Sequence, residues 1–379
     1  MVPLESTKET FVSYESSAEP IKIGYLMDFL ISEHFPQHFR DDLTDPFHMV
    51  FAEALTQGII DRPVEIIYKE VEGLPKGSVR AVNKAYEELV DEGCLVVFGP
   101  NITDNCAAAL EVIERRKVPA IGVTGSEEVL GEWFFSFPMG SMTDEPILWS
   151  QLLANRGLTD VGLLVEQSLV GESYAKRFHK AAARRGLRIV AEAPIAQTAQ
   201  DVTKSVGALH EAGATAIVHC GFGFGVVMVN PALDAIDWDP PRFAGTAWQN
   251  AWINPVMWNA FMGWIGVDQY DEANPIGQDF LDRYQQRYGR RPEWCVPVVN
   301  YDVARTLLEA ITDAHPLSPR GLKEAIERVK MLPAASGAPG TYVSFGKWKR
   351  QAWVGTGYIV ARQLDADGTN SHLVERFGD

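Results

Sequence analysis

The chain has 379 residues, of which 46% are hydrophobic and 22% are charged. A single hydrophobic core stops growing near ~250 to 300 residues, so this length predicts two α/β domains with separate cores. The 34 basic and 50 acidic residues give a formal charge of -16, which repels phosphate backbones and anionic lipid surfaces. We therefore expect no nucleic-acid partner.

The N-terminal residues and the cysteines bear on where the protein resides. Residues 1–20 are polar and lack the apolar central run of a secretory signal, which predicts a poorly ordered arm or an added β-edge rather than a signal. No apolar stretch approaches the ~20 residues that span a bilayer, so direct membrane insertion is not expected. As the sequence stands we expect a cytoplasmic protein, or a periplasmic or cell-surface one if the native start is trimmed or misassigned. The cysteines show no CxxC pairing and lie in apolar runs, which predicts buried free thiols at Cys94, Cys106, Cys220 and Cys295.

From Ile21 onwards, β-rich apolar runs alternate with helical patterns. The expected strands of the first half are 21–30, 63–70, 94–100 and 118–124, and the expected helices are 47–57, 77–91 and 104–116. Such alternation is typical of a parallel sheet with helices on both faces.

A bridge rich in turn residues, 135–146, leads into a second half in which the same alternation restarts. The patterns predict strands at 160–166, 187–195, 215–222, 242–248 and 263–270, with helices at 147–156, 174–185, 202–212, 275–288, 301–314 and 319–329. Segments 341–346 and 357–369 predict a hairpin-type ending. No Gly/Ser-rich spacer joins the halves, so we expect them to pack closely around a cleft.

Several segments, in their order and spacing, resemble those of one family. They are IKIGYLMDF from residue 21, CLVVFGPNITDNCAAALEVIERRKVPAIGVTGSEEVL from 94, VGLLVEQSLVGESYAKRF from 161, TAIVHCGFGFGVVMV from 215, FAGTAWQNA from 243 and VPVVNYDVARTLLEAI from 296. From about Ile21 to its end the chain resembles the type I periplasmic binding proteins, in the leucine/isoleucine/valine-binding branch of ABC-transporter substrate-binding proteins. The resemblance implies an α/β fold of two Rossmann-like lobes, joined by a three-strand hinge, with the ligand cleft between them.

The resemblance also implies how the chain is divided. We expect an N-terminal arm at 1–20, a first lobe built from 21–138 and 268–340, and a second lobe built from 139–267 and 341–379. Two departures limit what carries over. Asn101-Ile102-Thr103-Asp104 stands where the family's amino-acid binders present a serine-threonine run, and Val170 rather than an aromatic residue precedes Gly171-Glu172. These departures put an ordinary α-amino acid in question as the ligand.

Loops that follow the expected strands hold the candidate ligand-binding residues. At 99–104, the N–H groups of a helix start, aided by Thr103, suit a carboxylate or carbonyl oxygen; the alternative is that Asp104 only caps the helix. The turn 124–128 either caps a helix or donates to a ligand, and the resemblance favours binding. Aromatic residues after strands suit an apolar ligand body, with packing beneath the domain as the alternative. The candidates are Asp28, Phe29, Asn101, Ile102, Thr103, Thr124, Gly125, Ser126, Val170, Phe222, Phe224, Trp248, Gln249 and Tyr301.

Patterns that carry catalysis are missing from the sequence. None of GxxxxGK[ST], HExxH and GxSxG is present, and the 8 histidines are scattered. The run GFGFG at 221–225 reads GxGxG rather than GxGxxG, so it is a poor dinucleotide fingerprint. We therefore expect no catalytic residues, no metal ligands and no cofactor.

The function that we expect is that of a solute-binding protein, which captures a small organic ligand by lobe closure for ABC-type uptake. The ligand classes are amino-acid-like molecules, amides, and aromatic or branched carboxylates. One alternative is a cytoplasmic ligand sensor with the same fold, and a remote one is an enzyme acting on a small carboxylate or amide. Besides the ligand, the expected partner is an ABC transporter permease or a regulatory protein.

Overall fold

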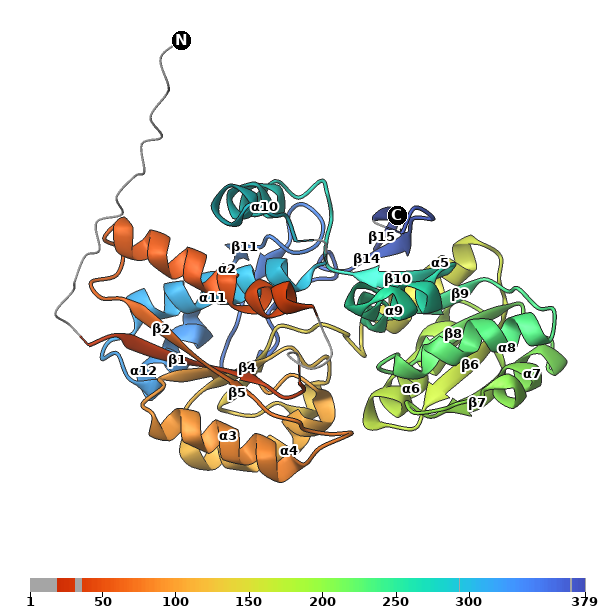
Figure 1. Cartoon of the computed structure of the whole chain (residues 1–379), viewed down its shortest axis with the longest axis horizontal. Coiled ribbons are helices and arrows are strands. Elements are labelled where there is room, and N and C mark those ends of the chain that lie inside the picture. Colours follow the sequence, from red (N-terminus) through yellow and green to blue (C-terminus); the bar gives the residue numbers. More distant parts are fainter. Residues whose placement is uncertain (1–18, 31–35, 293, 369, 379) are drawn as a thin grey trace, which may run out of the picture.

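The computed structural model describes residues 19–30, 36–292, 294–368 and 370–378, so the arm predicted at 1–20 lies almost entirely outside the described residues. Two sheets, each covered by helices, form two lobes that lie side by side (Figure 1). Within the described part of the chain, no helix combines the length and the apolar character needed to span a membrane. All four cysteines are described, and they are free and buried as predicted.

The first lobe is built on a five-stranded parallel sheet of order β2-β1-β3-β4-β5. Its strands are β1 (Ile21–Met27), β2 (Val64–Glu70), β3 (Val96–Phe98), β4 (Ala120–Gly122) and β5 (Phe134–Ser136). The helices are α2 (Gln37–Thr56), α3 (Val79–Asp91) and α4 (Thr103–Arg116), followed by the 3-10 turn η1 (Glu127–Val129). Apolar residues of α3 and α4 pack on one face of this sheet, while α2 packs on the other.

The second lobe repeats this topology, because its parallel strands have the order β7-β6-β8-β9-β10. They are β6 (Asp160–Glu166), β7 (Arg188–Ile195), β8 (Ala216–Cys220), β9 (Arg242–Ala244) and β10 (Trp264–Asp268), and the antiparallel strands β14 (Val360–Leu364) and β15 (Ser371–Arg376) extend the sheet. The helical elements are α5 (Glu145–Asn155), α6 (Leu169–Arg184), α7 (Thr203–Glu211), η2 (Phe224–Met228), α8 (Val229–Ala235), η3 (Thr246–Ile253) and α9 (Pro255–Phe261).

After β10 the chain returns to the first lobe. Helices α10 (Pro275–Tyr288), α11 (Val296–Asp313) and α12 (Pro319–Arg328) precede a small antiparallel sheet of β11 (Leu332–Pro333), β12 (Tyr342–Val343) and β13 (Trp353–Val354). The ring of Phe345 lies 5.5 Å from those of Phe135 and Phe137, and Ser136 pairs with Gln351. Residues 342–354 thus contact the first lobe, although the predicted division assigned them to the second.

The chain therefore crosses between the lobes after β5, after β10 and before β14 (Figure 1). Gln269 holds the crossings together. Its side-chain Nε2 donates to the carbonyl of Pro138 at 2.7 Å, and its own carbonyl accepts from Gly337 N at 2.7 Å. Trp353 Nε1 also donates to Pro138 O, at 3.1 Å. In the third crossing, the Tyr358 hydroxyl donates to Asp144 Oδ2, which follows the first crossing, at 2.7 Å. Because each strand of the hinge is bonded in this way, we expect the lobes to move as rigid bodies about this point.

Some predicted boundaries are corrected by the structure. Helix α2 begins at Gln37 rather than at Phe47. A proline usually stands in the first turn of a helix, but here Pro46 lies inside the helix. Helix α6 begins at Leu169, where Ser168 Oγ accepts from Gly171 N, and α11 begins at Val296. The C-terminal hairpin is β14–β15, whereas β12 pairs with β11 and β13.

Candidate ligand-binding site

The carboxyl ends of both parallel sheets border one cavity between the lobes, called the inner cavity below. Its volume is about 170 Å³. Loops after β1, β3 and β4 form one side and loops after β6, β8 and β9 the other, as expected for open parallel sheets. The lining residues are Phe29, Asn101, Ile102, Thr103, Val123, Thr124, Met139, Gly140, Met142, Val170, Tyr174, Gly221, Phe222, Thr246, Ala247, Gln249, Asn250, Ile253, Trp294 and Val296.

More than half of the candidate residues line the inner cavity. They come from segments directly after strands, where the sequence pattern places ligand loops. They are Phe29, Asn101, Ile102, Thr103, Thr124, Val170, Phe222 and Gln249.

Other lining residues were missed by the sequence analysis. Thr246 and Asn250 flank Gln249 in the same segment after β9, so the same argument would have found them. Tyr174 lies one turn into α6, and Trp294 precedes α11 with no strand before it. No local pattern marks the last two residues.

Asp28 does not line the cavity; its side chain instead bonds to the loop after β3, which does. Its buried carboxylate accepts hydrogen bonds from the backbone N–H groups of Asn101 at 3.0 Å and Ile102 at 2.9 Å, and from Asn105 Nδ2 at 2.8 Å. Burial raises the pKa of this carboxyl, and the hydrogen bond from Asn105 opposes that rise. Asp28 therefore holds the loop after β3 in place, and its acceptor oxygens are already used.

Glu166 holds a cavity loop of the second lobe in place, as Asp28 does in the first lobe. Its Oε2 accepts from the backbone N–H groups of Phe222 at 2.8 Å and Gly223 at 3.1 Å, while Oε1 accepts from Gln197 Nε2 at 2.6 Å. Asp28 follows β1 and Glu166 ends β6, and these strands are equivalent in the two sheets. Each lobe thus uses a carboxylate at the end of one strand to fix the ligand loop of the neighbouring strand.

A third buried carboxylate, Glu145, joins the start of α5 to the loop after β9. It accepts from the Tyr174 hydroxyl at 2.7 Å, from Thr246 N at 3.1 Å and from Thr246 Oγ1 at 2.5 Å. Burial raises the pKa of Glu145 to about 7, although the hydrogen bonds from Thr246 and Tyr174 favour the carboxylate. Thr246 and Tyr174, which both line the inner cavity, are positioned by this group.

Gly125 and Ser126 shape the turn after β4 without lining the cavity. Ser126 Oγ accepts from Glu128 N at 3.3 Å, so it caps η1. A Cβ atom at Gly125 would lie 1.7 Å from the carbonyl oxygen of Gly140, so only glycine fits against the first crossing. Asp104 does not cap α4, because the N-cap residue is Ile102 and no side chain caps the helix.

Trp248, Phe224 and Tyr301 do not line the inner cavity, contrary to prediction. Trp248 is fully buried in the core of the second lobe, packed over Gly266 of β10, where a Cβ atom would lie 2.0 Å from its Cγ. Phe224 lies beside Phe222, with ring centroids 5.2 Å apart, but on the core side. Tyr301 stacks on Phe280 at 4.3 Å inside the first lobe. Tertiary packing beyond the loops decides these positions.

Among the described residues, those that line the inner cavity carry hydrogen-bonding groups but no charged side chain. Within the described part of the chain, Asn101 Oδ1 and both polar atoms of the Gln249 amide, Oε1 and Nε2, are buried without a hydrogen-bond partner. Thr103 and Thr124 bond to each other through their hydroxyls at 2.9 Å. A buried acceptor without a donor costs free energy, so a bound molecule that supplies N–H or O–H groups would relieve that cost.

A wider cavity of about 620 Å³, called the outer cavity below, adjoins the inner one. Ile253 and Trp294 line both. Its walls come from α2, from η3 and α9, and from the segment before α11. Among the described residues, no cluster of His, Cys, Asp and Glu is arranged to hold a metal ion.

Comparisons with known proteins agree with this architecture. A model of the periplasmic binding protein family matches residues 20–362. A type 1 periplasmic binding protein from Bordetella pertussis Tohama I is 19% identical with a TM-score of 0.78, over 94% of this chain and 100% of that one. The leucine binding protein LivK from Thermotoga maritima MSB8 is 15% identical with a TM-score of 0.73, over 93% of this chain and 97% of that one. A possible leucine/isoleucine/valine-binding protein from Rhodopirellula baltica SH 1 is 16% identical with a TM-score of 0.77, over 96% of this chain and 98% of that one.

A search of curated protein sequences finds no match. At such low identities, the similarity to solved structures concerns the fold. It confirms the predicted fold class, an α/β architecture of two lobes with parallel sheets.

Proposed function

We propose that this chain, which belongs to the periplasmic binding protein family, captures a small organic molecule in the inner cavity and closes its two lobes around it. Family membership confirms the resemblance drawn from the loop segments. Proteins of this kind bind substrates and are typically not enzymes, and ABC-type uptake is the role that we propose here. In that role the protein would work outside the cell membrane and deliver its ligand to a transporter permease.

One observation carries the proposal. Among the described residues, the inner cavity has buried polar atoms without a hydrogen-bond partner in each lobe: the acceptor Asn101 Oδ1 in the first, and the acceptor Oε1 and donor Nε2 of Gln249 in the second. A ligand that donates to both acceptors is bound best when the lobes are closed, because only then are both acceptors within reach. The difference in affinity between open and closed forms is what drives closure.

The walls also narrow the ligand class. Among the described residues that line the inner cavity there is no charged side chain, and the carboxylates of Asp28, Glu145 and Glu166 behind this lining are occupied by the protein's own donors. Two of the similar structures are described as binding leucine or branched-chain amino acids. For this chain we propose a molecule whose buried part is uncharged and carries N–H or O–H donors, of which a carboxamide is the simplest.

A thermal-shift screen tests this function. The panel contains amino acids, aliphatic and aromatic amides, aromatic acids and nucleotides. A ligand present at a hundredfold excess over its Kd stabilises the folded chain by about 2.7 kcal/mol. We expect a saturable shift with one class of small organic molecule, and no turnover of the compound that produces it.

Variants at the two acceptors then test the site. Asn101→Ala and Gln249→Ala should each raise the Kd of the compound found by about tenfold, since each removes a hydrogen bond that the closed form makes. Gln286→Ala, an exposed position on α10, is the matched control and should leave the Kd unchanged. A panel without any saturable hit, or a hit whose Kd neither cavity variant alters, would contradict the proposal.

A further inference from the structure

The outer cavity differs from the inner one in its walls. Two tryptophans of the second lobe, Trp252 and Trp258, line it and stack on each other with ring centroids 4.6 Å apart and planes 12° from parallel. Both are only partly buried. Within the described residues, the indole Nε1 of Trp258 is buried and has no hydrogen-bond partner. An aromatic platform of this kind suits a flat apolar group.

The first lobe completes the outer cavity with Phe39 of α2 and with Trp294, whose rings lie 4.5 Å apart. Trp294 is held in place because its Nε1 donates to Asp42 Oδ2 at 3.1 Å. Aromatic side chains from both lobes therefore face the same space.

The arginines at this cavity are already in ion pairs. Arg290 pairs with Asp42, and its Nη2 also donates to the Tyr284 hydroxyl at 2.8 Å. Arg291 pairs with Asp282, and its Nη2 donates to Gln278 Oε1 at 2.6 Å. Because these guanidinium groups already have anionic partners, the outer cavity favours an apolar body over an anionic one.

The inner and outer cavities meet at Ile253 and Trp294, which line both. The inner cavity, at about 170 Å³, is smaller than the ~300 Å³ at which small-molecule sites usually begin, so it holds only a small group. A larger molecule whose head fills the inner cavity must extend past Ile253 and Trp294 into the outer one.

We propose that the ligand has two parts, an uncharged donor head group held in the inner cavity and a flat aromatic or apolar body held in the outer cavity against Trp252 and Trp258. This inference rests on the proposed function and makes its ligand class more specific. The head satisfies Asn101 Oδ1 and Gln249 Oε1, and the body is buried between the aromatic residues of the two lobes. Both parts thus connect the lobes.

Three probe compounds and one tryptophan variant test the inference. The probes are 3-phenylpropanamide, which has both parts, propanamide, which lacks the body, and 3-phenylpropanoate, which has an anionic head. Titration calorimetry of the full chain should give a Kd for 3-phenylpropanamide at least tenfold below those of the other two. In Trp258→Ala, the preference for 3-phenylpropanamide over propanamide should fall to less than threefold.

Two further variants keep this test clear. Trp348→Ala removes an indole that is 89% exposed and lies away from both cavities, and it should keep the full preference. Trp258→Phe preserves a flat ring and should keep most of it, which separates loss of the platform from loss of folding. Circular dichroism checks that each variant is folded.

Other outcomes overturn the inference or the function beneath it. Equal affinity for the two amides, tighter binding of the acid, or an unchanged preference in Trp258→Ala would overturn the two-part ligand. If none of the three probes binds while another compound of the wider panel does, the proposed function stands and this inference fails. If no compound of any class binds, both fail.

Discussion

Glu145 lies at the first residue of α5, where its carboxyl group joins Tyr174 to Thr246 at the edge of the inner cavity. Its pKa is about 7 in the folded chain against an ordinary value of 4.5. Between these pH values, the folded chain keeps a proton on Glu145 that the unfolded chain has released. The free energy of unfolding that depends on this group therefore falls as the pH rises from about 4.5 to 7, by up to about 3 kcal/mol.

The variant Glu145→Gln isolates this effect. Urea unfolding of both chains at pH 5 and pH 7.5 gives the difference in unfolding free energy at each pH. We expect the wild-type chain to lose stability relative to Glu145→Gln on going to the higher pH, because glutamine does not titrate. A difference that is independent of pH would show that Glu145 titrates at its ordinary pKa, and one that changes in the opposite direction would show that folding lowers its pKa; either result contradicts the prediction.

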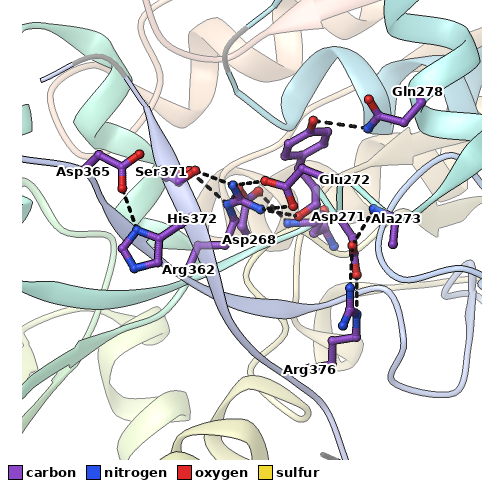
Figure 2. A network of polar contacts seen from close by, with 12 residues as sticks. Asp268, Asp271, Glu272, Ala273, Gln278, Arg362, Asp365, Ser371, His372 and Arg376 are labelled. Carbon is purple, nitrogen blue, oxygen red and sulfur yellow. Dashed lines mark hydrogen bonds and ion pairs between the residues drawn. The ribbon is translucent and has the colours of Figure 1, made fainter. Parts of the chain in front are cut away.

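At the scale of elements, the β14–β15 hairpin holds the second crossing of the hinge (Figure 2). Arg362 of β14 is buried; its Nη1 donates to Glu272 Oε2 at 2.9 Å, and its Nε lies 3.6 Å from Asp268 Oδ2. In the same network, Arg376 Nε donates to Asp271 Oδ2 at 2.7 Å. Residues near the end of the chain thus fix the segment that leads from β10 to α10.

Replacing Arg362 should therefore destabilise the whole chain. Arg362→Met keeps an unbranched apolar stem but leaves the buried carboxylate of Asp268 without its cation, at a cost of about 3 kcal/mol. Arg320→Ala, which breaks the exposed pair with Glu324 on α12, should leave the free energy of unfolding nearly unchanged. Chemical unfolding measures both. The double variant Asp268→Asn/Arg362→Met should recover part of the loss, and a loss equal to that of Arg320→Ala would refute the role assigned to the network.

At the scale of the whole molecule, an ion pair connects the lobes across the cleft. Arg177 Nη2 of α6 lies 3.9 Å from Glu128 Oε1 of η1. Glu128 is largely exposed, so the pair contributes less than about 1 kcal/mol to closure. On the proposed function, the ligand itself supplies most of the free energy that closes the lobes.

Arg177→Gln tests which of the two dominates. With the compound found in the screen at saturation, X-ray scattering should show the radius of gyration falling in the wild-type chain and equally in Arg177→Gln. The Kd should rise by less than about fivefold, which corresponds to the contribution of an exposed ion pair. A variant that binds but no longer contracts would mean that the ion pair, rather than the ligand, holds the lobes closed.

Local pattern was a good guide to much of the fold and to part of the site. Alternation of strands and helices indicated parallel sheets, and the ends of parallel strands lie at one edge. Asn101 and Thr103 were placed at the cavity from the end of the preceding strand, whereas the family resemblance decided in favour of Thr124. The same reasoning failed for Trp248, because whether a residue after a strand faces the cleft or the core depends on its neighbours. Gly266 of β10 leaves the space into which Trp248 packs.

The sequence by itself determined the fold class, the number of lobes and which loops approach the cleft, because these follow from hydrophobic periodicity and the direction of parallel strands. Only the tertiary structure decided which side chains remain available to a ligand. Asp28 was a candidate from its position, yet its oxygens are occupied by Asn101, Ile102 and Asn105. Trp294 lines both cavities because α11 returns from far along the chain. Hydrogen-bond saturation and contacts between distant segments depend on the packed lobes, and no local pattern encodes them.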